Sequence, residues 1–380
     1  MKIVNLSHPE AESWDHPKAL VVYTTQADTP SELQPIYALY PDLAVFGVSS
    51  FHGIMMHDGF KRGAWGILFE ANDRFDVRVM AVDLQGVTDI RATVRDAVRV
   101  WKQSETGSRQ FMIHATQGLE ERIIEGLSDT FGETAEIFGA TAGNDRFLDH
   151  GYVFLRDKKL TCGVLIVQMM KPHLSCMVTR GGYLTTLRQG VLTGAKGRVL
   201  LTIDNRPAAT VYNEWTDGRF DAYVSRGGDL PRSAGMYPLA HMLSTEPECG
   251  SWLVHPHFVD TTNMSLHVFA EIPENTPISL MRGSQESIIH RMKLAAKQAL
   301  SLVNRDDVQA AFIMFCAGCA SIVAENMHEV CDQASAELQN IPFLGCLSLG
   351  EQGRLSHAHR NYHGNMMISL ILVMKSDIAE

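Results

Sequence analysis

The chain has 380 residues, of which 45% are hydrophobic and 20% charged, and its formal net charge is -10. This length favours two domains with sizeable cores, and the acidic balance argues against nucleic acid or an anionic membrane as the main partner. No run reaches the roughly 18 uncharged apolar residues of a membrane span. The start has no signal-peptide pattern, and the seven scattered cysteines suit reduced thiols. The sequence therefore predicts a cytoplasmic protein without membrane insertion.

Three apolar strands of the same form recur along the chain. They are ALVVYTTQ (19–26), QFMIHATQG (110–118) and QAAFIMFCAG (309–318). Each precedes a helical stretch and then a second apolar strand that runs into a glycine turn. The interval between the two strands is long enough for a crossover that contains a helix, as a parallel strand pair requires.

The three glycine turns also resemble one another. They lie in DLAVFGVSSFHGIM (42–55), AEIFGATAGNDRF (135–147) and IPFLGCLSLGEQGR (341–354). After the turns, alternating patterns predict a hairpin over 64–83 around residues 71–73, a hairpin over 151–169 around residues 157–159, and a single strand over 365–374. A linking helix is predicted over 88–104 and another amphipathic helix from residue 284.

The unit is therefore β-α-β-turn-β(β), twice before about residue 210 and once, modified, after it. We predict a mixed α/β fold in which repeated β-α-β-β units form mixed sheets flanked by helices. We place two domains at 1–210 and 211–380, because Gly and Pro become more frequent over 181–240.

The turns place small polar side chains at the carboxyl ends of strands, where ligands collect in α/β sheets. Glycine lets the backbone bend there and approach a ligand. We expect the three turns to converge on a common cavity, in which Glu351 and Asp145 suit a cationic group. The alternative is that each turn is a tight corner needed only for packing. The candidate ligand-binding residues are Ser49, Ser50, His52, Thr141, Asn144, Ser348, Glu351 and His363.

The chain has sixteen histidines, an unusual number. Haem iron needs only one axial histidine, and our candidates are His52, at the first turn, and His255 or His257, which point to the same side of an extended segment. Two histidines alone are weak support for another metal. His114, inside an apolar strand, is expected to be a core histidine with its hydrogen bonds satisfied.

Cys316 and Cys319 form a Cys-x-x-Cys pair at the end of a predicted strand. Because no second such pair exists, this pattern favours buried reduced thiols over a zinc site or a redox pair.

Taken in order, VFGVSSFHG (45–53), IFGATAGNDRF (137–147) and FIMFCAGCAS, IPFLGCLSLGEQG and NYHGNMMISLILV (312–373) resemble the FIST family of sensory proteins. The resemblance spans about residues 15 to 375. It implies an intracellular bacterial signal-transduction sensor that binds a small ligand and acts on a kinase, cyclase or chemotaxis partner. The chain is similar to the free-standing NosP-type branch, which implies haem as cofactor, nitric oxide as signal and a histidine kinase as partner.

Four positions depart from the usual pattern of that family, namely His52, Cys319, Gln352 and Gly364. They leave open whether the ligand is haem or a small polar metabolite, such as the amino acid expected for typical members.

A hydrolase with Ser50 or Cys316 as nucleophile is a further alternative. The chain has no Gly-x-Ser-x-Gly elbow and no Walker phosphate loop, so we expect a binding protein without catalytic residues rather than an enzyme. A homodimer stays open.

Overall fold

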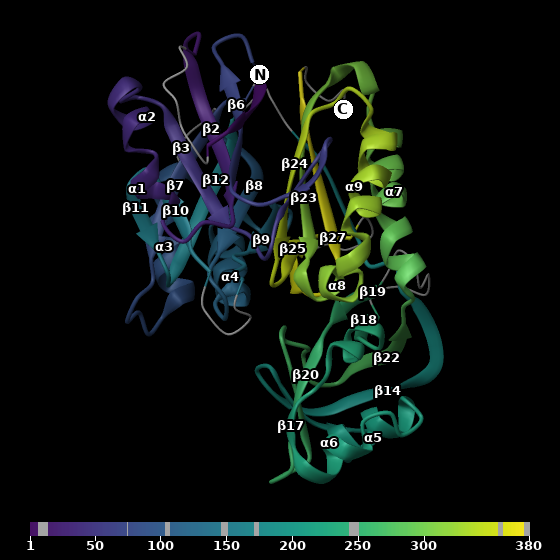
Figure 1. Ribbon diagram of the computed structural model, residues 1–380. Coiled ribbons are helices and arrows are strands. Elements are labelled where there is room, and N and C mark those ends of the chain that lie inside the picture. The colour runs from purple at the N-terminus through teal and green to yellow at the C-terminus, as the bar shows by residue number, and fades with distance from the viewer. Residues whose placement is uncertain are drawn as a thin grey trace.

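The computed structural model of the protein describes residues 1–6, 14–73, 75–102, 107–145, 151–170, 175–242, 251–355 and 360–375. Three repeated units build one body, at the top of Figure 1, and residues 184–282 build a second body below it. The second interrupts the chain between β13 (Ser175–Arg180) and α7 (Gln285–Ser301) of the first. We call them the three-unit body and the inserted body. The mixed α/β fold predicted from the repeats is confirmed.

The three-unit body consists of three six-stranded sheets with the same plan. The first sheet has the order β1 (Lys2–Asn5), β6 (Ala64–Glu70), β2 (Pro17–Thr24), β3 (Ala44–Ser49), β10 (Val153–Leu155) and β11 (Lys158–Leu160). The second has the order β7 (Val77–Asp83), β12 (Gly163–Met170), β8 (Gly107–Ala115), β9 (Glu136–Thr141), β25 (Glu351–Gly353) and β26 (Tyr362–Gly364). The third has the order β13, β27 (Ile368–Met374), β23 (Val308–Cys316), β24 (Phe343–Ser348), β4 (Ile54–Met56) and β5 (Gly59–Lys61).

Each sheet is centred on the parallel pair that the repeats predict, β2 with β3, β8 with β9, and β23 with β24. All nine residues of β23 are buried, as expected for a strand covered on both faces. The hairpin that follows each glycine turn joins the sheet of another unit. The first unit gives β4–β5 to the third sheet, the second gives β10–β11 to the first, and the third gives β25–β26 to the second. The units are therefore interlocked in a ring.

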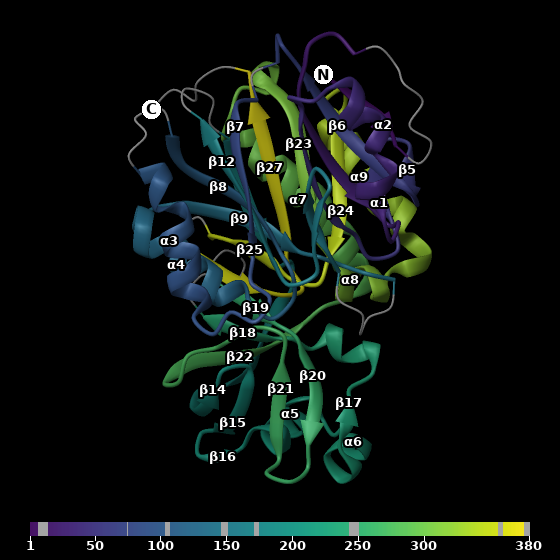
Figure 2. The ribbon, with the colours of Figure 1, turned by 90° about the vertical axis from the view of Figure 1, so that its left-hand side faces the viewer.

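Helices cover the outer face of each sheet, and the inner faces of all three sheets share one core (Figure 2). The first sheet carries α1 (Thr29–Glu32) and α2 (Gln34–Leu39), and the second carries α3 (Ile90–Lys102) and α4 (Glu120–Phe131). The third carries α7 and α9 (Met327–Leu338), and α8 (Ala317–Ile322) follows β23 directly. Within the described residues, none of these helices combines the length and apolar character needed to cross a membrane.

The hairpin predicted over 64–83 is wrong, because β6 and β7 belong to different sheets. β6 pairs with β1 and β2, whereas β7 pairs with β12. The link between them carries Phe75, which is buried in the shared core and stacks on Phe69 with ring centroids 4.0 Å apart. Burial of this ring draws the chain across the core from one sheet to the next. Of the hairpin predicted over 151–169, only the short pair β10–β11 is present. The rest of its second strand is β12, which pairs with β7 and β8 in the second sheet.

The prediction that His114 is a satisfied core histidine is also wrong. His114 is fully buried, but neither of its ring nitrogens has a hydrogen-bond partner among the described residues. It pairs with Ala140, the residue after the turn glycine, and Tyr23 and Met314 occupy the same register in the other two units. The ring of His114 meets Tyr23 edge-on, with centroids 5.6 Å apart. The equivalent interior position in each unit faces hydrocarbon, so burial lowers the pKa of His114 to about 3.

Glycine is required where the parallel strands approach each other before the turn. A Cβ on Gly47 would lie 2.0 Å from the carbonyl oxygen of Val22, and one on Gly139 would lie 2.0 Å from that of Ile113. No side chain fits there without separating the strands. Gly47 and Gly139 therefore serve close strand packing, which is the packing role that the sequence left open as an alternative for the turns.

In its described residues, the inserted body contains a nine-stranded sheet, two short α-helices and the 3-10 helix Arg232–Met236. The sheet has the order β17 (Gly228–Asp229), β20 (Pro256–Asp260), β21 (Ser265–Val268), β15 (Val199–Ile203), β14 (Leu184–Lys196), β22 (Thr276–Arg282), β18 (Leu239–Met242) and β19 (Ser251–Val254), and β16 (Arg206–Pro207) pairs with β15. The α-helices are α5 (Ala208–Trp215) and α6 (Asp221–Arg226). The boundary predicted near residue 210 lies in α5. Strands before and after that residue share this sheet, since β14 pairs with β22 and β15 with β21.

Candidate ligand-binding cleft

The three glycine turns meet in a ring of backbone hydrogen bonds. The N–H of Phe51 donates to the carbonyl of Leu347 at 3.0 Å. The N–H of Gly143 donates to Ser49 at 2.9 Å, and the N–H of Leu349 donates to Thr141 at 3.1 Å. Donor and acceptor occupy equivalent positions in each unit, four and two residues after the turn glycine. The turns thus converge, and their own backbone closes the ring.

The hydroxyl groups of the ring residues are buried and engaged in hydrogen bonds. Ser49 accepts from the N–H of Tyr152, and Ser50 accepts from the N–H of Leu347 and donates to the carbonyl of Gly53. Thr141 donates to Glu120 at 2.8 Å. These side chains hold the ring together, which accounts for small polar residues at the turn tips.

Glu351 lies in the same buried zone. Ser348 donates to it at 2.6 Å, and the N–H of Met367 donates to its other oxygen at 3.1 Å. Burial raises the pKa of the Glu351 carboxyl well above its usual value. The neutral form of Glu351 is therefore favoured, and its role here is in the packing of β25 against β27.

A cleft of ≈ 760 Å³ lies beside the ring, between the three-unit body and the inserted body. From the three-unit body it is lined by Phe51, His52, Gln117, Gly118, Asp145, Gly318 and Ser321. From the inserted body it is lined by Arg198, Val199, Asp229, Leu230, Pro231, Arg232, His255, His257, His267, Val268 and Phe269. This volume is typical of small-molecule and cofactor sites.

His52 sits at the edge of the cleft in a left-handed backbone conformation, with φ 58°. Its N–H donates to Asp145 Oδ1 at 3.0 Å, and its ring Nδ1 lies 3.4 Å from the same oxygen. Asp145 Oδ2 pairs with Arg62. Partial burial acts to raise the pKa of Asp145, but the hydrogen bonds from Arg62 and the His52 N–H hold it below its ordinary value. A carboxylate at Nδ1 orients the imidazole and leaves Nε2 as the nitrogen that can ligate a metal.

His255 and His257 lie across the cleft, at the end of β19 and in β20. Burial, with a smaller effect from His257, lowers the pKa of His255 to about 3. Burial, with a smaller effect from His267, lowers the pKa of His257 to about 4. His257 stacks on Phe269, with ring centroids 4.0 Å apart. Both imidazoles are therefore neutral near pH 7, the form that binds metal ions.

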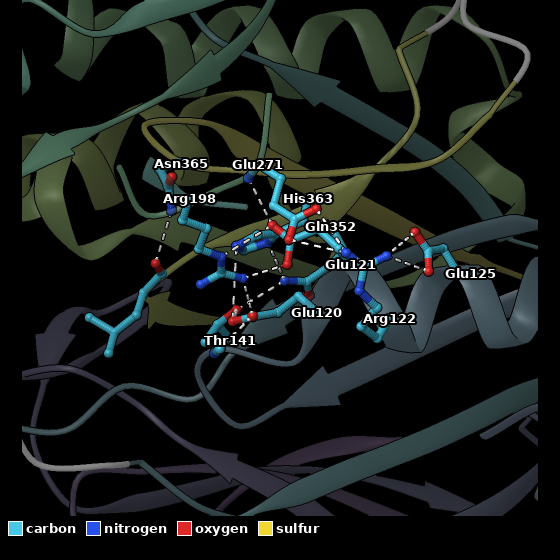
Figure 3. Close-up of polar contacts among 12 residues, drawn as sticks. Glu120, Glu121, Arg122, Glu125, Thr141, Arg198, Glu271, Gln352, His363 and Asn365 are labelled. Atoms are coloured by element: carbon cyan, nitrogen blue, oxygen red, sulfur yellow. Dashed lines mark hydrogen bonds and ion pairs between the residues drawn. The ribbon is translucent and has the colours of Figure 1, made fainter. Parts of the chain in front are cut away.

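A polar network joins the two bodies at one end of the cleft (Figure 3). Arg198 lies in the turn between β14 and β15, and its Nη2 donates at 2.6 Å to both Glu120 Oε2 and Glu121 Oε2 at the start of α4. The N–H of Glu271 donates to Glu121 Oε1 at 2.9 Å. Burial alone would raise the pKa of Glu120, but His363 and then Arg198 lower it to about 2. We call Arg198, Glu120, Glu121 and Glu271 the interbody latch.

His363 belongs to the surroundings of this latch. Its Nε2 lies 3.9 Å from Glu120 Oε1, and Gln352 hydrogen bonds to its Nδ1 at 3.0 Å. His363 also lines a second pocket of ≈ 340 Å³ between α4 and the inserted body. The network thus runs from the large cleft, which Arg198 lines, to this second pocket.

The structure brings together His52, His255 and His257 in one cleft. It places Ser49, Ser50, Thr141, Ser348 and Glu351 in the buried ring, Asn144 in the segment after the second turn, and His363 at the latch. Sequence reasoning missed Arg198, Asp229, Arg232 and Phe269. None of these four carried a sequence signal for a site. His267, which also lines the cleft, lies in β21, and Phe269 follows that strand. In the described part of the chain, no group of three or more His, Cys, Asp and Glu side chains is placed to hold a metal ion.

Residues 18–206 match the family described as the FIST N domain, and residues 208–354 match the FIST C domain. A comparison with curated proteins gives no match. Among solved structures, the chain is similar to a crystal structure of a chorismatase, with a TM-score of 0.37, 9% sequence identity, and coverage of 98% of this chain and 97% of that chain. A similarity of that size supports no statement about activity. The chain belongs to the FIST family, whose domains are small-molecule sensors of signal transduction.

Proposed function

We propose that the protein senses its ligand in the cleft between the two bodies, and that this ligand is haem, with nitric oxide as the signal. The observation that carries the proposal is the meeting of His52, His255 and His257 in a single cleft of ≈ 760 Å³. Haem iron needs one axial histidine. When bound, haem would supply the iron to which nitric oxide binds.

The residues present fit such a group. His52 is favoured as the axial ligand, because Asp145 lies 3.4 Å from its Nδ1 and leaves Nε2 for the iron. Phe51, Phe269 and Leu230 supply apolar surface for a flat ring, and Arg232 supplies a cation for a carboxylate. His255 and His257 are the alternative ligands on the opposite wall.

Replacing His52 with alanine is expected to move the Soret band of the haem-reconstituted protein and to reduce haem retention by at least about tenfold, since a ligand contributes more than its outer-shell partners. The measurement is the absorption spectrum before and after nitric oxide. Asp145→Asn is expected to shift the same band less, because the imidazole loses only its orienting carboxylate.

The matched control is His290→Ala on the exposed surface of α7, which should leave the spectrum unchanged. A Soret band at the same position in wild type and His52→Ala would remove His52 as the ligand, and His255→Ala and His257→Ala would then be compared. Failure of the wild-type protein to take up stoichiometric haem would overturn the haem proposal.

The second candidate ligand is a small zwitterion such as an amino acid. Asp229 and Arg232 both line the cleft, and neither forms an ion pair with another described residue. An acid and a base on one wall of the cleft suit an ammonium and a carboxylate of the same small ligand. Amino acids that bind only the folded protein should raise its melting temperature, and this effect should disappear in Asp229→Asn or Arg232→Gln.

We propose that the protein acts by binding rather than by catalysis. Among the described residues, the Ser50 hydroxyl hydrogen bonds to backbone groups of Gly53 and Leu347. Cys316 is buried, and its sulfur accepts from the N–H of Met366. Neither candidate nucleophile is paired with a histidine base among the described residues, which supports a sensor over a hydrolase.

We further propose that a partner histidine kinase covers β14. Leu184 and Leu187 on this strand are 65% and 101% exposed, and exposed apolar side chains of this size mark interaction surfaces. β14 also leads directly to Arg198 at the cleft, so this strand connects ligand site and surface.

Leu187→Asp is expected to weaken capture of the kinase by at least about tenfold, because it places a charge in an apolar contact. Pull-down and cross-linking provide the measurement, and Val100→Asp on α3, which is also exposed, is the control that should bind normally. If the wild-type protein alone elutes as a dimer and Leu187→Asp as a monomer, the strand is a contact between copies, and the kinase assignment fails.

A further inference from the structure

Three sulfur atoms gather beneath the floor of the cleft, where β23 runs into α8. Cys316 ends β23, Cys319 lies one turn further on in α8, and Met366 lies between β26 and β27. The Cys316 Sγ is 3.9 Å from the Met366 Sδ, and the Cys316 thiol hydrogen bonds with the Cys319 thiol. All three side chains are buried, with exposed fractions of 2%, 0% and 0%. Two thiols and a thioether therefore form one cluster of soft donors.

A hollow of ≈ 10 Å³ opens beside the cluster. This is room for about one water-sized atom. Cys316, Gly318 and His255 line it, and Gly318 and His255 also line the ligand cleft. The hollow therefore lies between the sulfur cluster and the cleft, on a short path for a small ion.

The spacing of the donors suits a metal ion. A metal–sulfur distance of about 2.3 Å places sulfur ligands about 4.0 Å apart in a trigonal plane, close to the observed 3.9 Å between Cys316 Sγ and Met366 Sδ. A Cβ on Gly318 would lie 2.8 Å from Met366 Sδ and 3.2 Å from His255 Nδ1. Glycine at this position lets the thioether and the imidazole approach the same point.

The buried Arg291 lies beside the cluster, and its positive charge favours a metal complex with a net negative charge. Arg291 is fully buried and donates to the carbonyls of Gly181 and Met366 at 2.9 and 2.7 Å. No described carboxylate lies within ion-pair distance of it, and its Nε has no partner in the described part of the chain. The Cys319 and Cys316 thiols and, more weakly, the Glu351 carboxyl act on it electrostatically. A buried guanidinium needs an anion, since an unpaired buried charge is costly. The hydroxyl of Tyr183, 3.3 Å from the Cys319 sulfur, completes the surroundings.

We propose that Cys316, Cys319 and Met366 bind a single cuprous ion. Soft thiolate and thioether ligands select Cu(I), and coordinating thiols lose their protons, here two, to solvent. Two thiolates and one monovalent ion carry a net charge of -1, which the +1 charge of Arg291 balances. Zn²⁺ with the same thiolates would be neutral, and a disulfide would carry no charge, so either would leave only the Glu351 carboxyl, whose neutral form is favoured, to balance Arg291. The site is independent of haem, because none of its three sulfur ligands lines the ≈ 760 Å³ cleft.

The test is competition for copper by the reduced, full-length protein without oxygen. Cu(I) is added with a coloured cuprous chelator and glutathione, and the loss of the chelator colour measures transfer to the protein. We expect the wild-type protein to bind one equivalent of Cu(I) and to keep it from the chelator. Cys316→Ser and Cys319→Ser should each lower the affinity by at least about 100-fold, since loss of even an outer-shell partner costs up to that factor. Met366→Leu should lower it by about tenfold, because only the neutral donor is lost.

Cys162→Ser is the matched control, since that half-buried thiol before β12 lies outside the cluster, and it should bind copper as the wild type does. Equal copper affinity in the wild type and Cys316→Ser would overturn the proposal, as would a wild type that cedes all copper to the chelator. If the cysteine variants do not fold, X-ray absorption of the copper-loaded wild type decides. Sulfur neighbours at about 2.3 Å support the site, and a shell of nitrogen and oxygen contradicts it.

Discussion

Arg198→Met is expected to lower the free energy of unfolding at pH 7 by about 3–5 kcal/mol, because removal of one partner of a buried pair leaves the other charge uncompensated. Glu120 is 1% exposed and the Arg198 side chain 22% exposed, and they are 2.6 Å apart. Urea unfolding followed by tryptophan fluorescence measures the change. His363 and then Arg198 lower the pKa of Glu120 from 4.5 to about 2. The stabilisation is therefore complete above about pH 4.5 and is lost as the pH falls toward 2.

Two variants decide whether the charge of Glu120 causes this loss. Glu120→Gln in the Arg198→Met background should recover most of the stability, because the uncharged amide no longer needs the guanidinium. Arg206→Met removes an arginine from the exposed pair with Glu214 and should cost far less. Equal effects of Arg198→Met and Arg206→Met, with no recovery in the double variant, would show that the latch contributes no more than a surface ion pair.

His114→Leu is expected to flatten the acid dependence of stability. The pKa of His114 is lowered from 6.5 to about 3 by burial. As the pH falls below 6.5, the unfolded chain binds a proton at this position that the folded chain does not bind, so stability falls by about 1.4 kcal/mol per pH unit. A leucine side chain binds no proton in either the folded or the unfolded state. The variant should therefore gain about 2 kcal/mol relative to wild type between pH 6.5 and pH 5, measured as urea midpoints at a series of pH values.

Tyr23→Phe is the matched control for His114→Leu. The Tyr23 hydroxyl is buried next to His114 and has no partner among the described residues. Burial raises its pKa well above the usual value, so it does not titrate between pH 3 and 7, and its removal should shift stability equally at every pH. A slope in His114→Leu equal to that of wild type would mean that His114 exchanges its proton freely in the folded state.

The parallel strand pairs could be predicted from the sequence because local patterns determine them. Apolar β-branched runs such as 19–24, a helical interval and a glycine at positions 47 and 139 specify a strand, a crossover and a close strand approach. This pattern of strand, helix and glycine turn occurs three times in the sequence, so three equivalent strand pairs could be predicted. His255 and His257 were also visible, since residues two apart in a strand share a face.

The exchange of hairpins between units could not be predicted in the same way. β4, β10 and β25 are only three residues long, and their partners lie far along the chain, at positions such as Gly345 and Ala140. Sequence patterns report which face of a strand is buried but not which strand covers its edge. The hairpin predicted over 64–83 failed for this reason.

The interbody latch and the cleft could not be predicted from the sequence for a related reason. Arg198 stands in a Gly-Arg turn typical of solvent-exposed loops, and its partner Glu120 lies 78 residues away in the chain. Charged residues in such turns are normally exposed. Only the docking of the inserted body on α4 makes this arginine part of a buried network.

The ring of exchanged hairpins also constrains how the protein is made. The edge of β9 in the second sheet has no partner strand until β25 has left the ribosome at residue 353. Unpaired strand edges invite association with other nascent chains. Contacts between residues more than 200 positions apart, such as Ala140 with Glu351, also form slowly. Biogenesis is therefore the stage at which this architecture is most exposed to misassembly and most dependent on chaperones.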